Sequence, residues 1–113
     1  MIKIIYCITR KQGMSVEEFQ RYWRETHASI AARIPGVRRY VQCHTLPQLY
    51  EGDSPPPYDG VAELWYDSAE EMMAGATTPE GRQAGRELLE DEKRFIDISQ
   101  SPIWIATENP VVE

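Results

Sequence analysis

A histidine on the predicted first helix is the residue whose type and spacing point most directly to chemistry. Phe19, Trp23 and His27 recur every four residues, so they share one face of a helix. An imidazole titrates at about pH 6.5, and modest burial or a neighbouring carboxylate makes it a general base or acid at neutral pH. The alternative is a buried histidine that one backbone carbonyl holds and that serves only packing.

A second polar group lies on the predicted strand that follows this helix. Tyr40, Gln42 and His44 alternate, so they lie on one face of that strand. If this face meets the first helix, a phenol, an amide and an imidazole converge near His27, and the phenol can donate to a developing enolate or carbonyl oxygen. Otherwise Tyr40 is amphipathic packing and His44 lies in solvent near the strand end.

A carboxylate and several aromatic rings complete the candidate set. Glu63 lies in the middle of another predicted strand, where a carboxylate is costly to bury without a partner. It could orient His27 or act as a base, although a structural ion pair is the favoured interpretation. The candidate substrate contacts, which could equally be core or packing residues, are Tyr6, Phe19, Trp23, Gln42 and Trp65.

The sequence gives little support for a metal or an organic cofactor. His27, His44 and Glu63 could form a two-histidine, one-carboxylate set, but no H-x-H or H-E-x-x-H spacing is present. There is no Gly-rich phosphate loop, nucleophile elbow or dinucleotide fingerprint. Cys7 and Cys43 lack metal or redox spacing, which favours reduced thiols in the cytoplasm. We therefore expect a cofactor-free protein.

The charge distribution limits the classes of partner. A net charge of −6 argues against nucleic acid. Residues 1–44 carry a net charge of +5 and residues 45–113 one of −11. This asymmetry can mark a basic patch for an acidic ligand or surfaces of opposite sign that meet in the fold or between subunits, although two solvated faces are the favoured interpretation. The N-terminal apolar run is too short for a signal peptide, and no stretch has the length of a membrane helix. We expect a cytoplasmic location and no membrane partner.

The elements that must position these residues follow the order β-α-β-β-α-β. Capping boxes at Ser15 and Ser68 and the Pro35-Gly36 stop mark the helix ends. We predict strands over 2–9, 37–46, 60–66 and 102–107, a helix over 15–34, a short helix from 68 that fails near Gly75, and a helix over 78–97. This order predicts one domain over 1–113, an α+β ferredoxin-like fold whose antiparallel sheet has helices on one face. The proline-rich loop 51–58 suggests a lid or a dimer-contact arm.

The whole chain resembles the EthD domain proteins of the dimeric α+β barrel superfamily. The matching segments are Ile-Lys-Ile-Ile-Tyr at 2–6 and the stretches 15–27, 35–40, 58–65 and 91–97. The Phe-x-x-x-Trp-x-x-x-His spacing followed by Pro-Gly is the most specific of these features. The resemblance implies a ferredoxin-like protomer that pairs sheet to sheet as a homodimer, which would also cover the free sheet face.

What the resemblance implies about the reaction is broader. The superfamily is similar in fold to lactone isomerases, polyketide cyclases and cofactor-free monooxygenases, which share small aromatic or lactone-like substrates. In the isomerase-like relatives a helix histidine lines the pocket and a tyrosine follows the same Pro-Gly turn, which implies site roles for His27 and Tyr40. We therefore expect an enzyme that uses acid–base chemistry on a small hydrophobic carbonyl, lactone or polyketide-like compound, with His27, Tyr40, His44 and Glu63 as candidate catalytic residues. A cofactor-free oxygenase and a non-enzymatic binding protein are the alternatives.

Overall fold

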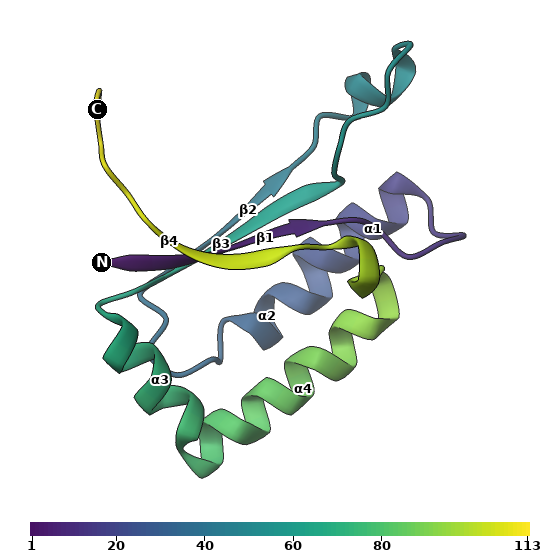
Figure 1. The fold of residues 1–113 in the computed structure, drawn as a ribbon. Coiled ribbons are helices and arrows are strands. Elements are labelled where there is room, and N and C mark those ends of the chain that lie inside the picture. Colours follow the sequence, from purple (N-terminus) through teal and green to yellow (C-terminus); the bar gives the residue numbers. More distant parts are fainter.

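The computed structural model describes all residues 1–113 and gives a four-stranded sheet with a layer of helices on one face (Figure 1). The strands are β1 Ile2–Ile8, β2 Arg39–His44, β3 Gly60–Tyr66 and β4 Ile103–Thr107. The helical elements are α1 Val16–Tyr22, the π-helical turn η1 Trp23–His27, α2 Ala28–Ala31, α3 Ala69–Thr77 and α4 Pro79–Phe95, with 3₁₀ turns at η2 Pro47–Glu51 and η3 Ile98–Gln100. The predicted β-α-β-β-α-β order is confirmed.

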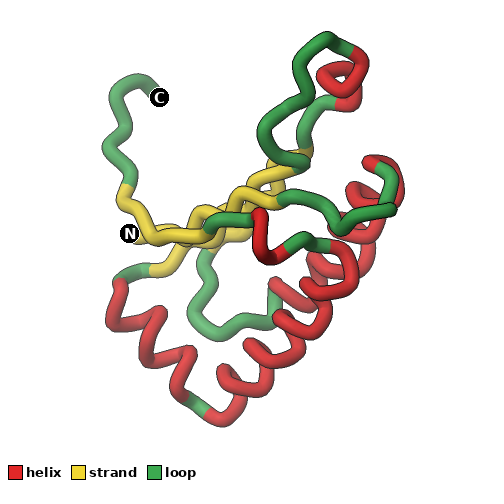
Figure 2. Tube along the Cα trace, turned by 45° about the vertical axis from the view of Figure 1, so that its right-hand side comes forward, coloured by secondary structure: helices red, strands yellow, loops and turns green.

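The sheet has the strand order β2-β3-β1-β4, and each neighbouring pair is antiparallel. Strands β1 and β2 therefore run parallel with β3 between them, which is the split β-α-β arrangement. In the turned view of Figure 2 all the long helices lie on the same side of the sheet. The sheet thus has one covered face and one open face.

The register assigns each strand residue to one of these faces. Tyr6 pairs with Ala62, and Ala62 pairs with Gln42, so these side chains share the helix-covered face. Glu63 is opposite Ile5 and Val41, one residue out of phase with Ala62. Because side chains alternate along a strand, Glu63 lies on the open face.

The first helix is one continuous helical segment that contains a wide turn. Its predicted cap is present, since the Ser15 hydroxyl accepts from the Glu18 N–H at 3.1 Å. The segment passes through the π turn η1, in which the Ala28 N–H reaches back to the Trp23 carbonyl, and it ends at Ala31 rather than at the predicted residue 34. Periodicity cannot reveal a single π turn, and such turns are frequent at functional sites.

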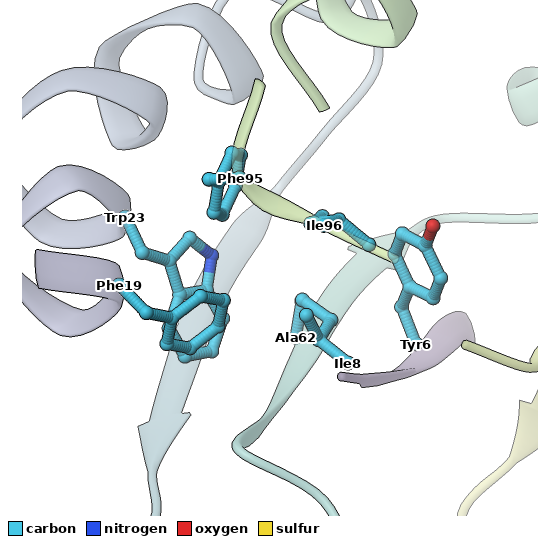
Figure 3. Close-up of a cluster of buried hydrophobic side chains, with 7 residues drawn as sticks. All are labelled: Tyr6, Ile8, Phe19, Trp23, Ala62, Phe95 and Ile96. Atoms are coloured by element: carbon cyan, nitrogen blue, oxygen red, sulfur yellow. The ribbon is translucent and has the colours of Figure 1, made fainter. Parts of the chain in front are cut away.

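The core lies between the first helix, α4 and the sheet (Figure 3). Phe19 and Trp23 are fully buried, and their ring centroids lie 5.5 Å apart. The Trp23 ring rests on the backbone of Gly60, where a Cβ atom would come within 2.4 Å of it. A glycine at this position therefore creates the space for the indole.

Other predicted boundaries also differ from the structure. The strand predicted over 37–46 covers only Arg39–His44, and the strand predicted over 2–9 ends at Ile8. The helix α3 does not fail at Gly75 but continues to Thr77, because Gly75 packs closely against the Pro35 carbonyl, 2.9 Å from where a Cβ would be. The helix α4 ends at Phe95, two residues before the predicted end. None of the helices is long and apolar enough to cross a membrane.

The loop between β2 and β3 projects beyond the sheet (Figure 1). Its base is held by the buried carboxylate of Asp59, which accepts a hydrogen bond from Tyr50 Oη at 2.5 Å and pairs with Arg10 at 2.6 Å. The loop is therefore anchored at the end of the sheet rather than folded over the helix layer.

Candidate functional site

The imidazole of His27 is buried, with an exposed fraction of 4%, and forms a short hydrogen bond with a carboxylate. Its Nδ1 lies 2.7 Å from Oδ2 of Asp91 on α4, which is equally buried. The other carboxylate oxygen of Asp91 accepts from Tyr22 Oη at 2.5 Å. Phe95 packs against the imidazole with ring centroids 4.7 Å apart. These contacts fix both the position and the plane of the imidazole.

The hydrogen-bond partners also fix which ring nitrogen is free. A carboxylate only accepts hydrogen bonds, so Nδ1 of His27 must carry the proton that bridges to Asp91. In the neutral ring Nε2 then keeps its lone pair and can accept a proton. Burial lowers the pKa of His27, opposed by its hydrogen bond and the charge of Asp91. The imidazole is therefore neutral and basic at Nε2 near pH 7.

A small cavity of about 30 Å³ lies beside His27, between the helices and the sheet. Its walls come from β1, β2, β3, the first helix, α4 and the residue after it: Tyr6, Ile8, Trp23, His27, Ala31, Tyr40, Ala62, Leu64, Leu88, Glu92 and Ile96. Seven of these are buried, whereas Tyr40, Leu64, Leu88 and Glu92 are half-buried and form the outer rim. The cavity has room for one water molecule or one oxygen atom.

The side chains of β2 form a network in which every donor is determined. One atom of the Gln42 amide group lies 2.9 Å from the Trp23 carbonyl oxygen. Because a carbonyl oxygen only accepts hydrogen bonds, this atom is the amide nitrogen Nε2. The same nitrogen donates to Tyr40 Oη at 2.9 Å. The amide oxygen then faces Nε2 of His44 at 2.9 Å, so this His44 nitrogen carries the proton.

This network leaves the hydroxyl proton of Tyr40 uncommitted. The phenol oxygen accepts from Gln42, so its O–H is available as a donor at the rim of the cavity. Burial raises the pKa of Tyr40, while the Gln42 amide and the indole N–H of Trp23 act in the opposite direction. The phenol therefore stays protonated at neutral pH and can act as a hydrogen-bond donor.

The carboxyl group of Glu92 borders the cavity as well. Sequence reasoning missed Glu92, Asp91 and Tyr22. Burial, reinforced by the charge of Asp91, raises the pKa of Glu92 to about 7. Its charge also raises the pKa of Tyr6 and Tyr40, which places the carboxyl group near both phenols. A carboxyl group with this pKa can both donate and accept a proton at neutral pH.

A signal for these acids was present in the pattern of α4. Gly81, Ala84, Leu88 and Phe95 mark its apolar face at helical spacing, and Asp91 and Glu92 fall on that face one turn before Phe95. A carboxylate on an apolar helix face needs a partner in the protein interior. Tyr22 carries no comparable signal, since a tyrosine next to an apolar stripe is common packing.

The predicted site residues separate into two groups. His27, Tyr40, Tyr6 and Trp23 border the same cavity, and Phe19 packs directly behind Trp23. Gln42 connects Tyr40 to His44 at the edge of this group.

Glu63 and Trp65 lie on the open face of the sheet, away from His27. Glu63 pairs with Lys3 at 2.9 Å, which is the structural ion pair that the strand position suggested. The indole of Trp65 donates to Glu108 at 2.9 Å and is covered by the cations of Lys3 and Arg39. The two-histidine, one-carboxylate set is consequently not assembled, and no cluster of three metal-ligating side chains occurs.

A larger surface hollow, of about 440 Å³, is also bordered by Asp91. Its lining is mainly charged, with Arg33, Arg86 and Arg94 balanced by Glu87 and Glu90. His27 does not border it. The smaller cavity is therefore the candidate site, because it alone combines His27, Tyr40 and Glu92.

Comparison with known proteins places this chain in a family. Solved structures that resemble the chain include an EthD family protein from Bacillus halodurans C-125 (TM-score 0.70, 22% identity, 96% of this chain and 99% of that chain). Another is a dimeric ferredoxin-like protein of unknown function from Thermobifida fusca YX (TM-score 0.62, 15% identity, 95% and 90%). A third is SnoaB, a cofactor-independent oxygenase from Streptomyces nogalater (TM-score 0.58, 14% identity, 98% and 95%).

These likenesses establish a shared ferredoxin-like α+β fold, as the sequence predicts. A comparison with curated proteins gives no significant match. The EthD domain model matches residues 11–99, a range that includes His27, Tyr40, Asp91 and Glu92. The chain therefore belongs to the EthD domain family.

Proposed function

We propose that the protein is a small enzyme that moves a proton on a small, largely apolar carbonyl or lactone compound without a cofactor. The observation that carries this proposal is the buried pair of His27 Nδ1 and Asp91 at 2.7 Å beside a cavity that Tyr40 and Glu92 also border. A histidine that served only packing would need no such second set of polar groups around the same space.

Each polar group has a distinct role in the proposal. Nε2 of His27 takes a proton from the carbon next to the carbonyl, and the electron pair of that C–H bond becomes the enolate. Asp91 stabilises the imidazolium that forms. Tyr40 donates to the oxygen on which charge develops. The carboxyl group of Glu92, with its pKa of about 7, returns a proton to the enolate or to its oxygen.

The lining of the cavity supports the substrate class. Apart from His27 and Glu92 its walls are aliphatic or aromatic, and no lysine or arginine side chain borders it. Two carboxyl groups, those of Asp91 and Glu92, lie close by, so an anionic substrate would be repelled. A neutral compound, with its carbonyl oxygen in the cavity and its apolar part at the rim near Leu64 and Leu88, fits this environment.

Deuterium incorporation tests the proposal without knowledge of the natural substrate. The protein is incubated in deuterated buffer with cyclohexanone and with 2(5H)-furanone. Proton NMR follows the hydrogens next to the carbonyl of the ketone and the C5 hydrogens of the furanone, which are the acidic ones in each compound. We expect catalysed exchange that His27→Asn reduces by about 10²–10⁴-fold, the usual contribution of a positioned base. Exchange that is equally fast in the wild type and in His27→Asn would refute the assignment.

The same assay separates the two alternative functions. If oxygen is consumed during turnover of an electron-rich phenol and His27→Asn stops the uptake, the base serves an oxygenase, the activity that is named for SnoaB. If compounds bind but neither exchange nor oxygen uptake is catalysed, the protein is a carrier. Neither result is expected for the isomerase- or cyclase-type chemistry proposed here.

We also infer that the chain forms a homodimer through the exposed apolar edge strand of its sheet. Ile103, Trp104 and Ile105 on the edge strand β4 are 58%, 46% and 53% exposed. With Ile4 and Met72 they line a hollow of about 360 Å³ that has only hydrophobic walls, and isolated chains rarely expose such patches. The T. fusca relative is described as dimeric.

Sedimentation should give a dimer for the wild type and a monomer for Trp104→Glu; a monomeric wild type would refute this.

A further inference from the structure

The indole N–H of Trp23 is a buried donor without a partner. The side chain is fully buried, and Nε1 forms no hydrogen bond. A buried donor without a partner lowers the stability of the folded protein, and such groups are rare in proteins. The other two indoles differ, since Trp65 donates to Glu108 and Trp104 is exposed to solvent.

The position of this donor relates it to the cavity. Trp23 and Tyr40 border the same space, and in Figure 3 the indole nitrogen lies on the side of the ring that is turned away from the helix. The N–H is directed toward the Tyr40 oxygen as a weak donor, which favours the phenolate, but it does not reach hydrogen-bond geometry with that oxygen. Two donors, the indole N–H and the phenol O–H, therefore border a space that holds one oxygen atom.

We propose that Trp23 Nε1 and Tyr40 Oη form a two-donor binding site for the carbonyl or enolate oxygen of the substrate, and that Gln42 positions both donors. This inference rests on the proposed function, because it names the place of the substrate oxygen during proton transfer by His27. A substrate oxygen at this point accepts from both donors and satisfies the indole N–H.

Gln42 sets the geometry of both donors through one nitrogen. Its Nε2 holds the Trp23 carbonyl in the π turn and the Tyr40 oxygen, each at 2.9 Å. Both amide protons are thereby used, so the phenol proton must point elsewhere. His44 fixes the amide oxygen, which prevents the amide from turning over. The π turn, the strand β2 and the phenol are thus connected by a single side chain.

A matched pair of neutral probes tests the oxygen site. Cyclohexanone and methylenecyclohexane have the same shape, but only the ketone has an oxygen acceptor. In a ¹H–¹⁵N spectrum of the wild type, cyclohexanone should move the Trp23 indole proton downfield while the Trp65 signal stays in place, and methylenecyclohexane should cause no downfield shift. The infrared carbonyl band of bound cyclohexanone should move to lower frequency. A Trp23 signal that stays unmoved at the solubility limit of cyclohexanone overturns the proposal.

Variants extend this measurement. One neutral hydrogen bond contributes about 0.5–1.5 kcal/mol, so Trp23→Phe and Tyr40→Phe should each weaken cyclohexanone binding by about 2- to 13-fold relative to methylenecyclohexane. Gln42→Met should return the carbonyl band of bound cyclohexanone toward its position in water. If Gln42 only stabilised the fold, the band would not move. Equal losses for both probes in all three variants would overturn the site. Should Trp23→Phe not fold, the wild-type spectra decide.

The two proposals fail in different ways. His27→Asn should slow deuterium exchange by about 10²–10⁴-fold yet leave the Trp23 shift and the carbonyl band of bound cyclohexanone intact. If exchange depends on His27 but the Trp23 signal and the carbonyl band do not respond, the oxygen site is wrong and the acid–base assignment stands. If both respond to cyclohexanone and His27→Asn retains exchange, the oxygen site stands and the base has been misassigned.

Discussion

The two faces of the sheet carry similar residue types in opposite conditions. On the open face, Glu63 is neutralised by Lys3 at 2.9 Å and the Trp65 indole donates to Glu108 at 2.9 Å. On the covered face, Glu92 has no counter-charge, so burial raises its pKa to about 7, and the indole N–H of Trp23 has no partner. A carboxylate and a tryptophan are thus satisfied on one face and unsatisfied on the other.

This difference shows which polar groups still have hydrogen-bonding capacity for a ligand. A satisfied group has already used its hydrogen-bonding capacity, so it stabilises the fold and has little left to offer a ligand. An unsatisfied buried group lowers the stability of the folded state and regains that free energy when a substrate atom completes it. The proposed chemistry therefore belongs to the covered face, although both faces contain the residue types that sequence reasoning selected.

The largest expected effect is that of Asp91→Asn. Tyr22 donates to one oxygen of Asp91, so in the variant the amide oxygen stays with Tyr22 and the amide nitrogen faces His27. The imidazole then keeps its proton on Nε2 and loses its basic nitrogen, which should slow deuterium exchange by about 10³–10⁴-fold. Glu63→Gln on the open face is the matched control and should leave the rate unchanged. Equal effects of the two variants would erase the distinction between the faces.

Glu92→Gln should change the pH dependence of both rate and stability. The base His27 must be neutral and the acid Glu92 protonated, so exchange by the wild type should fall above pH about 7, and the variant should lose this alkaline limb.

The raised pKa of Glu92 also has a consequence for stability. Its pKa rises from 4.5 in the unfolded chain to about 7 in the folded state, so its contribution to stability is complete below pH 4.5 and disappears as the pH rises through 7. Glu92→Gln should therefore raise the free energy of unfolding at pH 9 by ~3 kcal/mol relative to the wild type. Urea denaturation at pH 5 and 9 measures this, and a constant difference between the two proteins would contradict the raised pKa.

Two alanine substitutions probe how tightly the covered face is filled. At Gly60 a Cβ would come within 2.4 Å of Trp23 and 3.0 Å of the Cys43 carbonyl, so Gly60→Ala should destabilise the fold by about 1–3 kcal/mol and displace the indole. Gly85→Ala on α4 meets no atom within 4 Å and should stabilise the helix by about 0.5–1 kcal/mol. Thermal unfolding measures both, and a neutral Gly60→Ala would show that Trp23 is loosely held.

The smallest effect is expected on the open face. Lys3 and Glu63 are partly exposed, at 14% and 23%, so breaking their pair by Glu63→Gln should cost no more than about 1 kcal/mol, and less at high salt. The hydrogen bond with Glu63 raises the pKa of Lys3, so this contribution is present below pH 10.5 and is lost at higher pH. Denaturation at low and high salt checks this. A loss comparable with that of Gly60→Ala would contradict it.

The order of elements and the grouping of side chains on each strand could be predicted because they follow from local patterns. Alternation on β2 correctly grouped Tyr40, Gln42 and His44, and helical spacing correctly grouped Phe19, Trp23 and His27. Alternation alone also puts Glu63 one residue out of phase with Ala62, but it does not say which phase faces the helices. That choice depends on how the sheet and the helix layer pack.

The partners of these residues could not be predicted, because they depend on contacts distant in sequence. His27 and Asp91 are 64 residues apart, and neither residue specifies the other. The π turn at Trp23 arises from one extra residue in a helical turn, which leaves no trace in the periodicity. The acids of α4 were detectable as polar residues on an apolar face, yet their role required the cavity.

The ¹⁵N chemical shifts of the two His27 ring nitrogens at pH 7, with and without cyclohexanone, test the central claim most directly. The hydrogen bond with Asp91 predicts a protonated Nδ1 and an unprotonated Nε2 whose signal moves when the ketone binds. A proton on Nε2, or an Nε2 signal that ignores the ketone, would show that His27 is a packing residue and not the base of an active site.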